Sequence, residues 1–316
     1  MLPERPRSDP KRIGAGDRDG AEPALARGLG ARASRALLSA VAGLLALSLG
    51  VAMLAHGRPL ATASGAEPPM PAPPSQTLYR VVGCRSGGTA AHREGPPRKW
   101  VAFGFDDGPW TDTPAFVRML ERNDARATFF MIGRQLTPAF RSTLLRELRD
   151  GDVLGDHTFT HPDLTRTGDV RGQLEQTIAA IRGLTGYTPC VFRPPYGAYD
   201  SHVLSVARSV GLSTIMWNVD PADYTQPGSA AIEQRVLAAV RPGSIVISHD
   251  GGGPRGQTLA AYPGIIRKLR ARGYRIATVT EMLGYRPVYE PCVKLCEGIG
   301  VPRRRLPRDA ILVRAP

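Results

Sequence analysis

The sequence is poor in the residues that build small zinc-stabilised modules. Its cysteines form no CxxC pair, and no Cys/His spacing typical of a zinc finger occurs. No internal repeat of fixed period is visible either. A zinc finger is therefore excluded, and the three possible pairings of the four cysteines stay open. These cysteines are Cys84, Cys190, Cys292 and Cys296.

Basic residues outnumber acidic ones, and the formal net charge of the 316-residue chain is +13. Such an excess is compatible with binding to nucleic acid, to an anionic membrane surface or to an acidic polymer, and charge alone does not choose among them. The 29 prolines and 35 glycines predict that a good part of the chain is linker. The apolar content of 42% is ordinary for a globular protein.

The N-terminal part of the sequence predicts a membrane segment. Residues 1–35 are polar and basic, and we expect them to be disordered and cytoplasmic. Residues 36–55 carry no charge, and 20 apolar residues in a helix span roughly 30 Å, the thickness of a bilayer core. We therefore expect a transmembrane helix over 36–57, with the rest of the chain outside the cytoplasm. A cleaved signal peptide, which would give a secreted protein, is the alternative, although the long leader favours an anchor.

The rest of the chain divides by composition. Residues 58–98 are rich in Pro, Ala and Gly and are expected to be an extended linker. Residues 99–288 have the pattern of a folded domain, and residues 289–316 read as a basic C-terminal tail. Two cysteines near the start of this tail predict that it is linked to the domain by a disulfide bond, because an exported protein forms disulfides.

Within 99–288, short apolar runs alternate with amphipathic stretches. This pattern predicts an α/β fold with parallel strands covered by helices, either a distorted (β/α) barrel of about seven strands or an open sheet. The expected strands are 99–105, 127–133, 151–157, 190–195, 212–219, 243–249 and 274–280. The expected helices are 114–123, 173–186, 200–211, 230–240 and 259–273.

Polar residues that suit metal chemistry follow the expected strands, where sites are built in barrels and open α/β sheets. Asp106 and Asp107 close the first strand, and both reach one site if the strand ends at Gly108. His157 and His161 are four residues apart, which on a helix places both imidazoles on one face. Two histidines and one carboxylate form a three-ligand catalytic metal set, with Asp107 as the third ligand.

Further polar residues follow the later strands. Arg193 precedes two prolines that fix the chain, so that N–H groups such as that of Tyr196 are held in place. Asp220 and Asp223 follow the next strand, where turn and helix-capping roles are the alternative. His249 ends a strongly apolar strand, together with the next residue, Asp250, and is better placed for a cleft than for the core.

The order of these motifs resembles one known family. The stretches FDDGP, HTFTH, RPPYG, DPADY and ISHD occur in the order found in polysaccharide deacetylases, the NodB-homology domains of the fourth carbohydrate esterase family. The resemblance covers about Trp100 to Gly284 and extends to peptidoglycan N-acetylglucosamine deacetylases. It implies a metal-dependent hydrolase that uses zinc, with cobalt as an alternative.

The resemblance also implies a role for individual residues. Asp107, His157 and His161 match the metal ligands, Asp106 the catalytic base and His249 the general acid. The remaining matches are Arg193, which holds the base, Asp223, which orients the acid, and Tyr196, whose N–H helps bind the oxyanion. Tyr224 and Ile247 depart from the family's more frequent Trp and Leu, which bears on the shape of the pocket for the acetyl methyl group.

The expected function is removal of N-acetyl groups from an extracytoplasmic polysaccharide. Peptidoglycan amino sugars are the first candidate substrate, with chitin oligosaccharides and acetylated xylan as alternatives within the family. A glycosidase that uses Asp106 and Asp107 as its carboxylate pair is a rival hypothesis, since it does not need the histidines. An inactive wall-binding module is another. We expect a monomer attached to the membrane by its N-terminal helix, with no nucleic-acid partner.

Overall fold

The computed structural model describes residues 78–86, 91–292, 300–302 and 305–314. The expected cytoplasmic segment 1–35 and the expected transmembrane helix 36–57 lie outside these residues, so both stay predictions. Within the described ranges, the structure has no helix with the length and apolarity needed to cross a bilayer.

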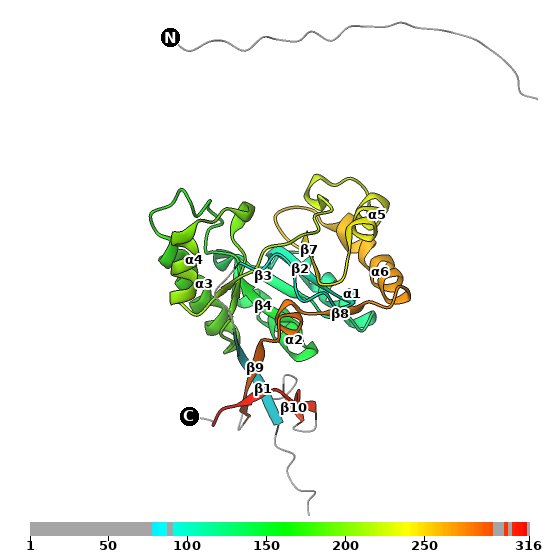
Figure 1. The fold of residues 1–316 in the computed structure, drawn as a ribbon. Coiled ribbons are helices and arrows are strands. Elements are labelled where there is room, and N and C mark those ends of the chain that lie inside the picture. Colours follow the sequence, from blue (N-terminus) through cyan, green and yellow to red (C-terminus); the bar gives the residue numbers. More distant parts are fainter. Residues whose placement is uncertain (1–77, 87–90, 293–299, 303–304, 315–316) are drawn as a thin grey trace, which may run out of the picture. The chain divides into compact units, whose positions relative to one another are not determined.

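Seven parallel strands form the central sheet, in the order β6-β5-β4-β3-β2-β7, with β8 paired to β2 beside the start of β3 (Figure 1). The parallel α/β fold predicted from the sequence is therefore confirmed. The strands are β2 (Trp100–Gly108), β3 (Thr128–Met131), β4 (Val153–Asp156), β5 (Val191–Phe192), β6 (Ser213–Thr214), β7 (Ser244–His249) and β8 (Arg275–Ala277).

The sheet curls on itself without closing fully, because its outer strands β6 and β7 do not form a ladder. An isolated parallel bridge joins Val219, which follows β6, to Val246 in β7. The segment before β2 also spans the gap, since His92 bridges to Ile215 and Glu94 to Ser244. The result is a curled half-barrel, consistent with the expected distorted barrel.

The central strands form because their sequences are apolar on both faces, as in sheets covered by helices on both sides. All four residues of β3 and nearly all of β2 and β7 are buried. The ring of Phe105 packs against those of Phe116, Phe129 and Tyr262 at centroid distances between 4.7 and 5.3 Å. This aromatic cluster joins β2 to the helices and holds the strand that carries the first site residues.

Helices cover the sheet and follow the expected ranges closely. Two were not expected from the sequence. The buried face of α2 includes only Leu144, Glu147 and Leu148, and α7 begins at Val279, inside the range 274–280 that was expected to be a strand. Asp169 and Asp200 cap the starts of α3 and α4 by accepting hydrogen bonds from backbone N–H groups. The helices are α1 (Thr113–Arg122), α2 (Arg141–Asp150), α3 (Val170–Thr185), α4 (Ser201–Ser209), α5 (Ser229–Ala239), α6 (Gly256–Ala271) and α7 (Val279–Met282).

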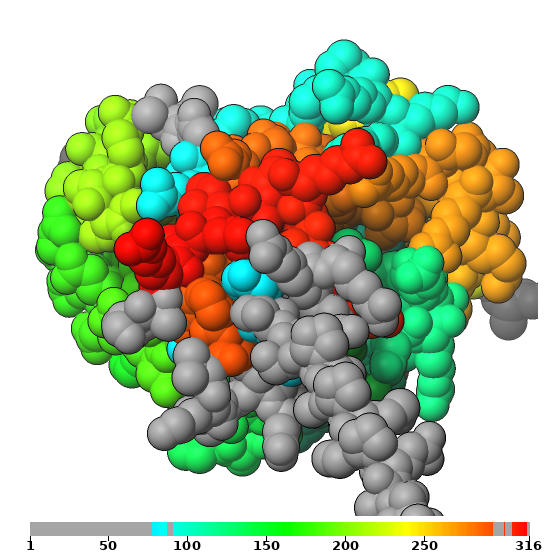
Figure 2. All heavy atoms as spheres, turned by 90° about the horizontal axis from the view of Figure 1, so that it is seen from below, coloured from blue at the N-terminus to red at the C-terminus, as the bar shows by residue number. Residues whose placement is uncertain are grey.

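A second, four-stranded sheet contradicts two of the expected boundaries. Residues expected in the linker form β1 (Leu78–Arg85), which pairs antiparallel with β9 (Arg286–Pro291). Residues expected in the tail form β10 (Val301–Pro302) and β11 (Ile311–Leu312), and the strand order is β10-β1-β9-β11. Figure 2 shows the C-terminal residues, in red, beside those of β1, in cyan.

The physical reason for these corrections is long-range pairing, which composition does not reveal. LYRVVGCR alternates weakly between apolar and polar residues, and a strand of this kind is stable only against a partner some 200 residues later. A disulfide between Cys84 and Cys190 ties β1 to the start of β5. This resolves the pairing of two of the four cysteines, and Cys292 is also disulfide-bonded.

Candidate active site

A cleft of about 490 Å³ opens at the carboxyl ends of the parallel strands. Most of its lining comes from the motifs singled out in the sequence. These motifs are spread over some 140 residues of the chain, and the strands bring them together. The lining residues are Asp106, Asp107, His157, His161, Pro194, Tyr196, Trp217, Asp220, Tyr224, Ile247 and His249.

The two aspartates reach the same cleft because β2 is irregular at its end. The pairing with β3 shifts register between Asp106, opposite Phe130, and Gly108, opposite Met131. Asp107 is the extra residue, and its φ of 70° turns the chain out of the regular pleat. The sequence predicted that the strand ends here, and the structure places the break one residue earlier, at Asp107 itself.

The two histidines converge by a different route from the one expected. They do not share a helical face, because residues 157–161 form a loop after β4. Thr158 and His161 both adopt left-handed conformations, with φ of 67° and 64°, and the His161 N–H donates to Thr158 Oγ1. The imidazole centroids are 5.0 Å apart. The spacing of four residues is therefore correct for a shared ligand, but the turn that achieves it is not helical.

Asp107, His157 and His161 together fit a divalent cation. One ligand atom from each lies within 4.8 Å of the others. Asp107 Oδ1 is 3.4 Å from His157 Nε2 and 3.2 Å from His161 Nε2, and this buried oxygen has no hydrogen-bond partner. Buried carboxylate oxygens normally have a hydrogen-bond partner, and a cation bound by the two imidazole nitrogens would take the place of one for this oxygen.

Contacts around the three ligands orient the two imidazole rings and keep the carboxylate of Asp107 ionised. His157 Nδ1 lies 2.7 Å from the Arg193 carbonyl oxygen, and His161 Nδ1 lies 3.2 Å from the Tyr196 hydroxyl. These contacts orient each ring with Nε2 toward the cleft. Burial raises the pKa of Asp107, but its contacts with the two imidazoles outweigh burial and hold the pKa far below its ordinary value. Its carboxylate is therefore ionised.

Asp106 has a different partner, the fully buried Arg193. Arg193 Nη1 donates to Asp106 Oδ1 at 2.7 Å, and the guanidinium also donates to the carbonyls of Ile215 and Met216. The guanidinium lies 4.2 Å above the ring of Phe130, which fixes its plane. The arginine thus holds one oxygen of Asp106 and leaves the carboxylate group at the wall of the cleft.

His249 and Asp223 form a second charge pair that also borders the cleft. Asp223 Oδ1 lies 2.7 Å from His249 Nδ1, and its Oδ2 accepts from the His249 N–H and from Thr258 Oγ1. Burial lowers the pKa of His249, but the Asp223 carboxylate outweighs it, so the pKa lies above its ordinary value. A histidine held in this way keeps its proton near neutral pH.

The residues that depart from the family pattern also line the cleft. The Tyr224 ring meets the His249 imidazole edge-on at 5.7 Å and is 54% exposed, whereas Ile247 is buried. Tyr196 is 72% exposed with a left-handed backbone. Asp220 is exposed at the cleft and accepts a hydrogen bond from the Ala222 N–H.

One predicted site residue does not reach the cleft, and two others were missed. Asp250 is fully buried below it, where Thr113 Oγ1 donates to its carboxylate, so its role is to support the loop. Trp217 lines the cleft, and its position near the end of the expected strand 212–219 was a usable signal. Thr258 reaches Asp223 from α6, and nothing in the sequence marks that hydroxyl.

Comparison with known proteins agrees with this geometry. The sequence profile of the polysaccharide deacetylase family matches residues 93–215. A peptidoglycan N-acetylglucosamine deacetylase from Bacillus cereus is 37% identical over 198 residues, which is 60% of this chain and 90% of the relative. A chitooligosaccharide deacetylase from Sinorhizobium fredii is 37% identical over 204 residues, covering 60% of this chain and 94% of the relative.

Longer relatives and solved structures match the same part of the chain. The deacetylase PgdA of Listeria monocytogenes is 35% identical over 189 residues, but the match spans 59% of this chain and only 39% of the relative's length. The solved structure of the Bc1960 peptidoglycan N-acetylglucosamine deacetylase superposes with a TM-score of 0.58 and 31% identity, covering 61% of this chain and 92% of that one. The chain therefore belongs to the polysaccharide deacetylase family.

Proposed function

We propose that this protein is a metal-dependent deacetylase that hydrolyses N-acetyl groups of a polysaccharide. The observation that carries the proposal is the joint placement, in one cleft, of a three-ligand cation site, an aspartate held by Arg193 and a histidine paired with Asp223. An acetamide is a poor electrophile with a poor leaving group. Its hydrolysis therefore requires activation of the carbonyl group and protonation of the departing amine.

Asp107, His157 and His161 would hold the cation, for which zinc suits the two-histidine, one-carboxylate set. When bound, such an ion polarises a carbonyl oxygen and lowers the pKa of bound water toward ~7. Asp106 stands beside the ligands with one oxygen fixed by Arg193. It accepts the proton of the attacking water, and the Tyr196 N–H donates to the oxyanion, a contribution of roughly 2.7–4 kcal/mol per donor.

His249 completes the reaction on the leaving-group side. Its Nδ1 is occupied by Asp223, which leaves Nε2 as the atom that carries a proton toward the cleft. His249 protonates the departing amine, and its raised pKa keeps it charged before the reaction begins. Ile247, Tyr224 and Trp217 supply apolar surface in the same cleft, suited to the acetyl methyl group.

The rival glycosidase assignment has less support. It requires Asp106 and Asp107 to act as a carboxylate pair across a sugar. Asp106 is instead bound to a buried arginine, and Asp107 faces two imidazoles that such a mechanism does not use.

For the substrate and its location we propose cell-wall peptidoglycan outside the cytoplasm. Support comes from the names of the Bacillus cereus and Listeria monocytogenes relatives and from the apolar run at 36–55. Disulfide bonds at Cys84 and Cys292 are compatible with an oxidising compartment. Chitin oligosaccharides, named for the Sinorhizobium fredii relative, are the alternative substrate.

Acetate release tests the proposal. The zinc-loaded chain is incubated with peptidoglycan, chitin oligomers and acetylxylan, with and without a chelator. We expect acetate from peptidoglycan, and we expect the chelator to abolish its release. Release of reducing sugar without acetate, unaffected by the chelator, would favour the glycosidase instead.

A further inference from the structure

A second cavity lies at the opposite end of the barrel from the catalytic cleft. Its volume is about 360 Å³, and it is enclosed between the four-stranded sheet and the amino ends of the parallel strands. Trp100, Val153 and Arg275 are the first residues of β2, β4 and β8, and all three line it. Val81 and Tyr289, from β1 and β9, form the facing wall.

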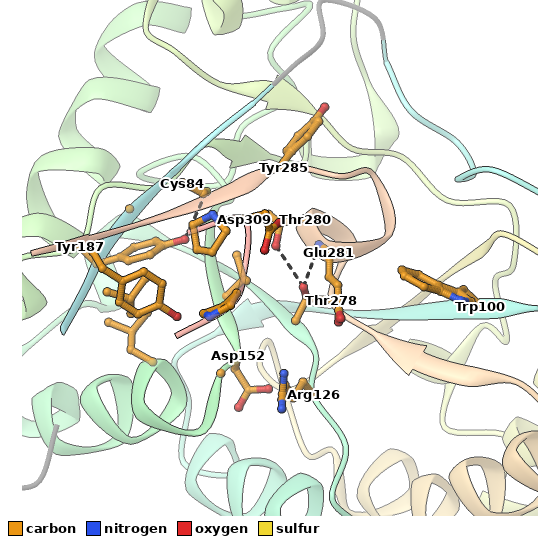
Figure 3. Close-up of a pocket in the computed structure, with 18 of the residues that line it drawn as sticks. Cys84, Trp100, Arg126, Asp152, Tyr187, Thr278, Thr280, Glu281, Tyr285 and Asp309 are labelled. Carbon is orange, nitrogen blue, oxygen red and sulfur yellow. Dashed lines mark hydrogen bonds between the residues drawn. The ribbon is translucent and has the colours of Figure 1, made fainter. Parts of the chain in front are cut away.

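The cavity walls combine aromatic rings with polar groups (Figure 3). Tyr289 contributes a half-buried ring, whereas Tyr187 and Tyr285 are buried and form part of the wall behind it. The Thr278 and Thr280 hydroxyls also line the cavity and lie 3.0 Å from each other. In Figure 3 Tyr187 and Trp100 lie on opposite sides of the group of side chains, with Asp152 and Arg126 close together at its lower edge. A cavity of this size with a mixed lining is typical of a site for a small polar molecule.

Two charged groups at this cavity form no hydrogen bond or ion pair through their side chains with any residue that the structure describes. They are the Arg126 guanidinium and the Asp309 carboxylate, and both residues are exposed. Burial raises the pKa of the nearby Asp152 carboxyl, although the Arg126 guanidinium lies close enough to lower that pKa in part. Arg275, in contrast, is paired with Glu281 and lies 4.6 Å above the Trp100 ring. As far as the described part of the chain goes, the cavity therefore presents one guanidinium with donors to spare and one carboxylate with acceptors to spare.

The charges of the cavity nearly cancel, which limits the chemistry of its ligand. Arg126 is opposed by Asp309, and Arg275 by Glu281. The remaining acid, Asp152, is buried, and burial raises its pKa to about 8, so it adds little negative charge at neutral pH. A strongly anionic or cationic ligand would meet a like charge here. A neutral molecule with both donors and acceptors would satisfy Arg126 and Asp309 together.

We propose that this cavity binds a sugar unit of a glycan. Sugar hydroxyls donate to a carboxylate and accept from a guanidinium, and the C–H face of the sugar packs on an aromatic ring, here that of Tyr289. The site would hold a glycan at the end of the barrel away from the chemistry. That this glycan is an N-acetylamino-sugar polymer rests on the proposed function.

The tryptophans allow the two sites to be observed separately. The chain has only three, of which Trp100 lines this cavity and Trp217 the catalytic cleft. Trp110 lines neither and serves as a reference. The indole N–H signals of the zinc-loaded full chain are followed by NMR during titration with the N-acetylglucosamine tetramer and, separately, with inorganic phosphate.

We expect a saturable shift of the Trp100 signal with the tetramer and none with phosphate. Arg126→Ala should raise the dissociation constant measured at the Trp100 signal by about tenfold, because one hydrogen bond to a charged group is lost. The dissociation constant measured at the Trp217 signal should stay unchanged. Tyr289→Phe, which keeps the ring, tests the hydroxyl alone. Arg182→Ala, at an exposed position on α3, is the matched control and should change neither.

Three results would overturn the proposal: a Trp100 signal that does not move with the tetramer, one that responds to phosphate instead, or one whose titration is the same in Arg126→Ala. Failure of the proposed function is a separate outcome. If no substrate releases acetate while Trp100 still titrates with the tetramer, the second site stands and the deacetylase assignment does not.

Discussion

Asp106 and Asp107 are chemically identical neighbours, and their contacts give them different roles. Arg193 donates to Asp106, whereas Asp107 faces His157 and His161 with an unpartnered oxygen. The Arg193 guanidinium fixes the position of the Asp106 carboxylate, and the Asp107 oxygen between two imidazoles is available to an ion. The assignment of base and ligand at the level of single residues rests on this difference.

Asp106→Asn removes the base while keeping the shape of the side chain. We expect deacetylation to fall about 10²–10⁴-fold, because proton transfer from water is lost. Bound zinc, measured by elemental analysis, should stay at one ion per chain, since the three ligands are untouched. Asp124→Asn, at an exposed position after α1, is the control and should be fully active. Full activity of Asp106→Asn with zinc bound would contradict the assignment.

The Asp223–His249 pair makes a prediction about pH. Because Asp223 raises the pKa of His249, the acid stays protonated to higher pH, and activity is lost as pH rises through that pKa. In Asp223→Asn the largest of the contributions that raise the pKa of His249 is gone, and only the more distant Asp106 and Asp107 still oppose burial. The alkaline limb of kcat/KM should therefore move to lower pH. Asp220→Asn, three residues earlier, should leave that limb in place. An unchanged alkaline limb in Asp223→Asn would show that another group is the acid.

At the scale of the elements, the disulfide between Cys84 and Cys190 joins two sheets. It links β1 to the residue before β5, and Arg193 is the residue directly after β5. The bridge closes a loop with a sequence separation of 106 residues. In the chain-entropy account, a loop of about 100 residues contributes about 4.7 kcal/mol by restricting the unfolded chain.

Replacing both of these cysteines should therefore destabilise the fold. We expect Cys84→Ser/Cys190→Ser to lose about 2–5 kcal/mol in free energy of unfolding, measured by urea denaturation. A reducing agent should lower the stability of the wild type far more than that of the double variant. Equal sensitivity of the two proteins to reduction would mean that this bridge does not support the fold.

Local sequence patterns were sufficient to place some strands and helices but not others. Strands β2, β3 and β7 are apolar runs bounded by glycine or polar residues, and their positions follow from local pattern alone. Helix α2 was missed because RSTLLRELRD has only two apolar residues on its buried face. Strand β1 was missed because its stability comes from β9 and from Cys190, which are distant in sequence.

At the scale of the whole molecule, a bound cation would couple two separate segments. Asp107 lies at the end of β2, and His157 and His161 lie in the loop after β4, so an ion held by all three would link β2 to the end of β4. A ligand that binds only the native state stabilises it by about 2.7 kcal/mol when its free concentration is a hundred times the dissociation constant.

Removal of the metal should thus lower thermal stability as well as activity. We expect a chelator to reduce the melting temperature of the wild type by several degrees, and zinc to restore it. His161→Ala, which lacks one ligand, is the matched control and should show little change on either treatment. A wild-type melting temperature that is insensitive to chelator and to added zinc would contradict the metal site.

The sequence by itself determined the parallel α/β fold, most of the residues that meet in the cleft and the spacing of the histidines. It could do so because strand patterns are local and because the ends of parallel strands gather at one edge of a sheet. Only the tertiary structure decided how these residues are arranged. The bulge at Asp107, the loop that turns His157 toward His161 and the pairing of β1 with β9 all depend on contacts between segments far apart in the chain. Such contacts leave no periodic signal, because their energy comes from packing and pairing that exist only once the chain is folded.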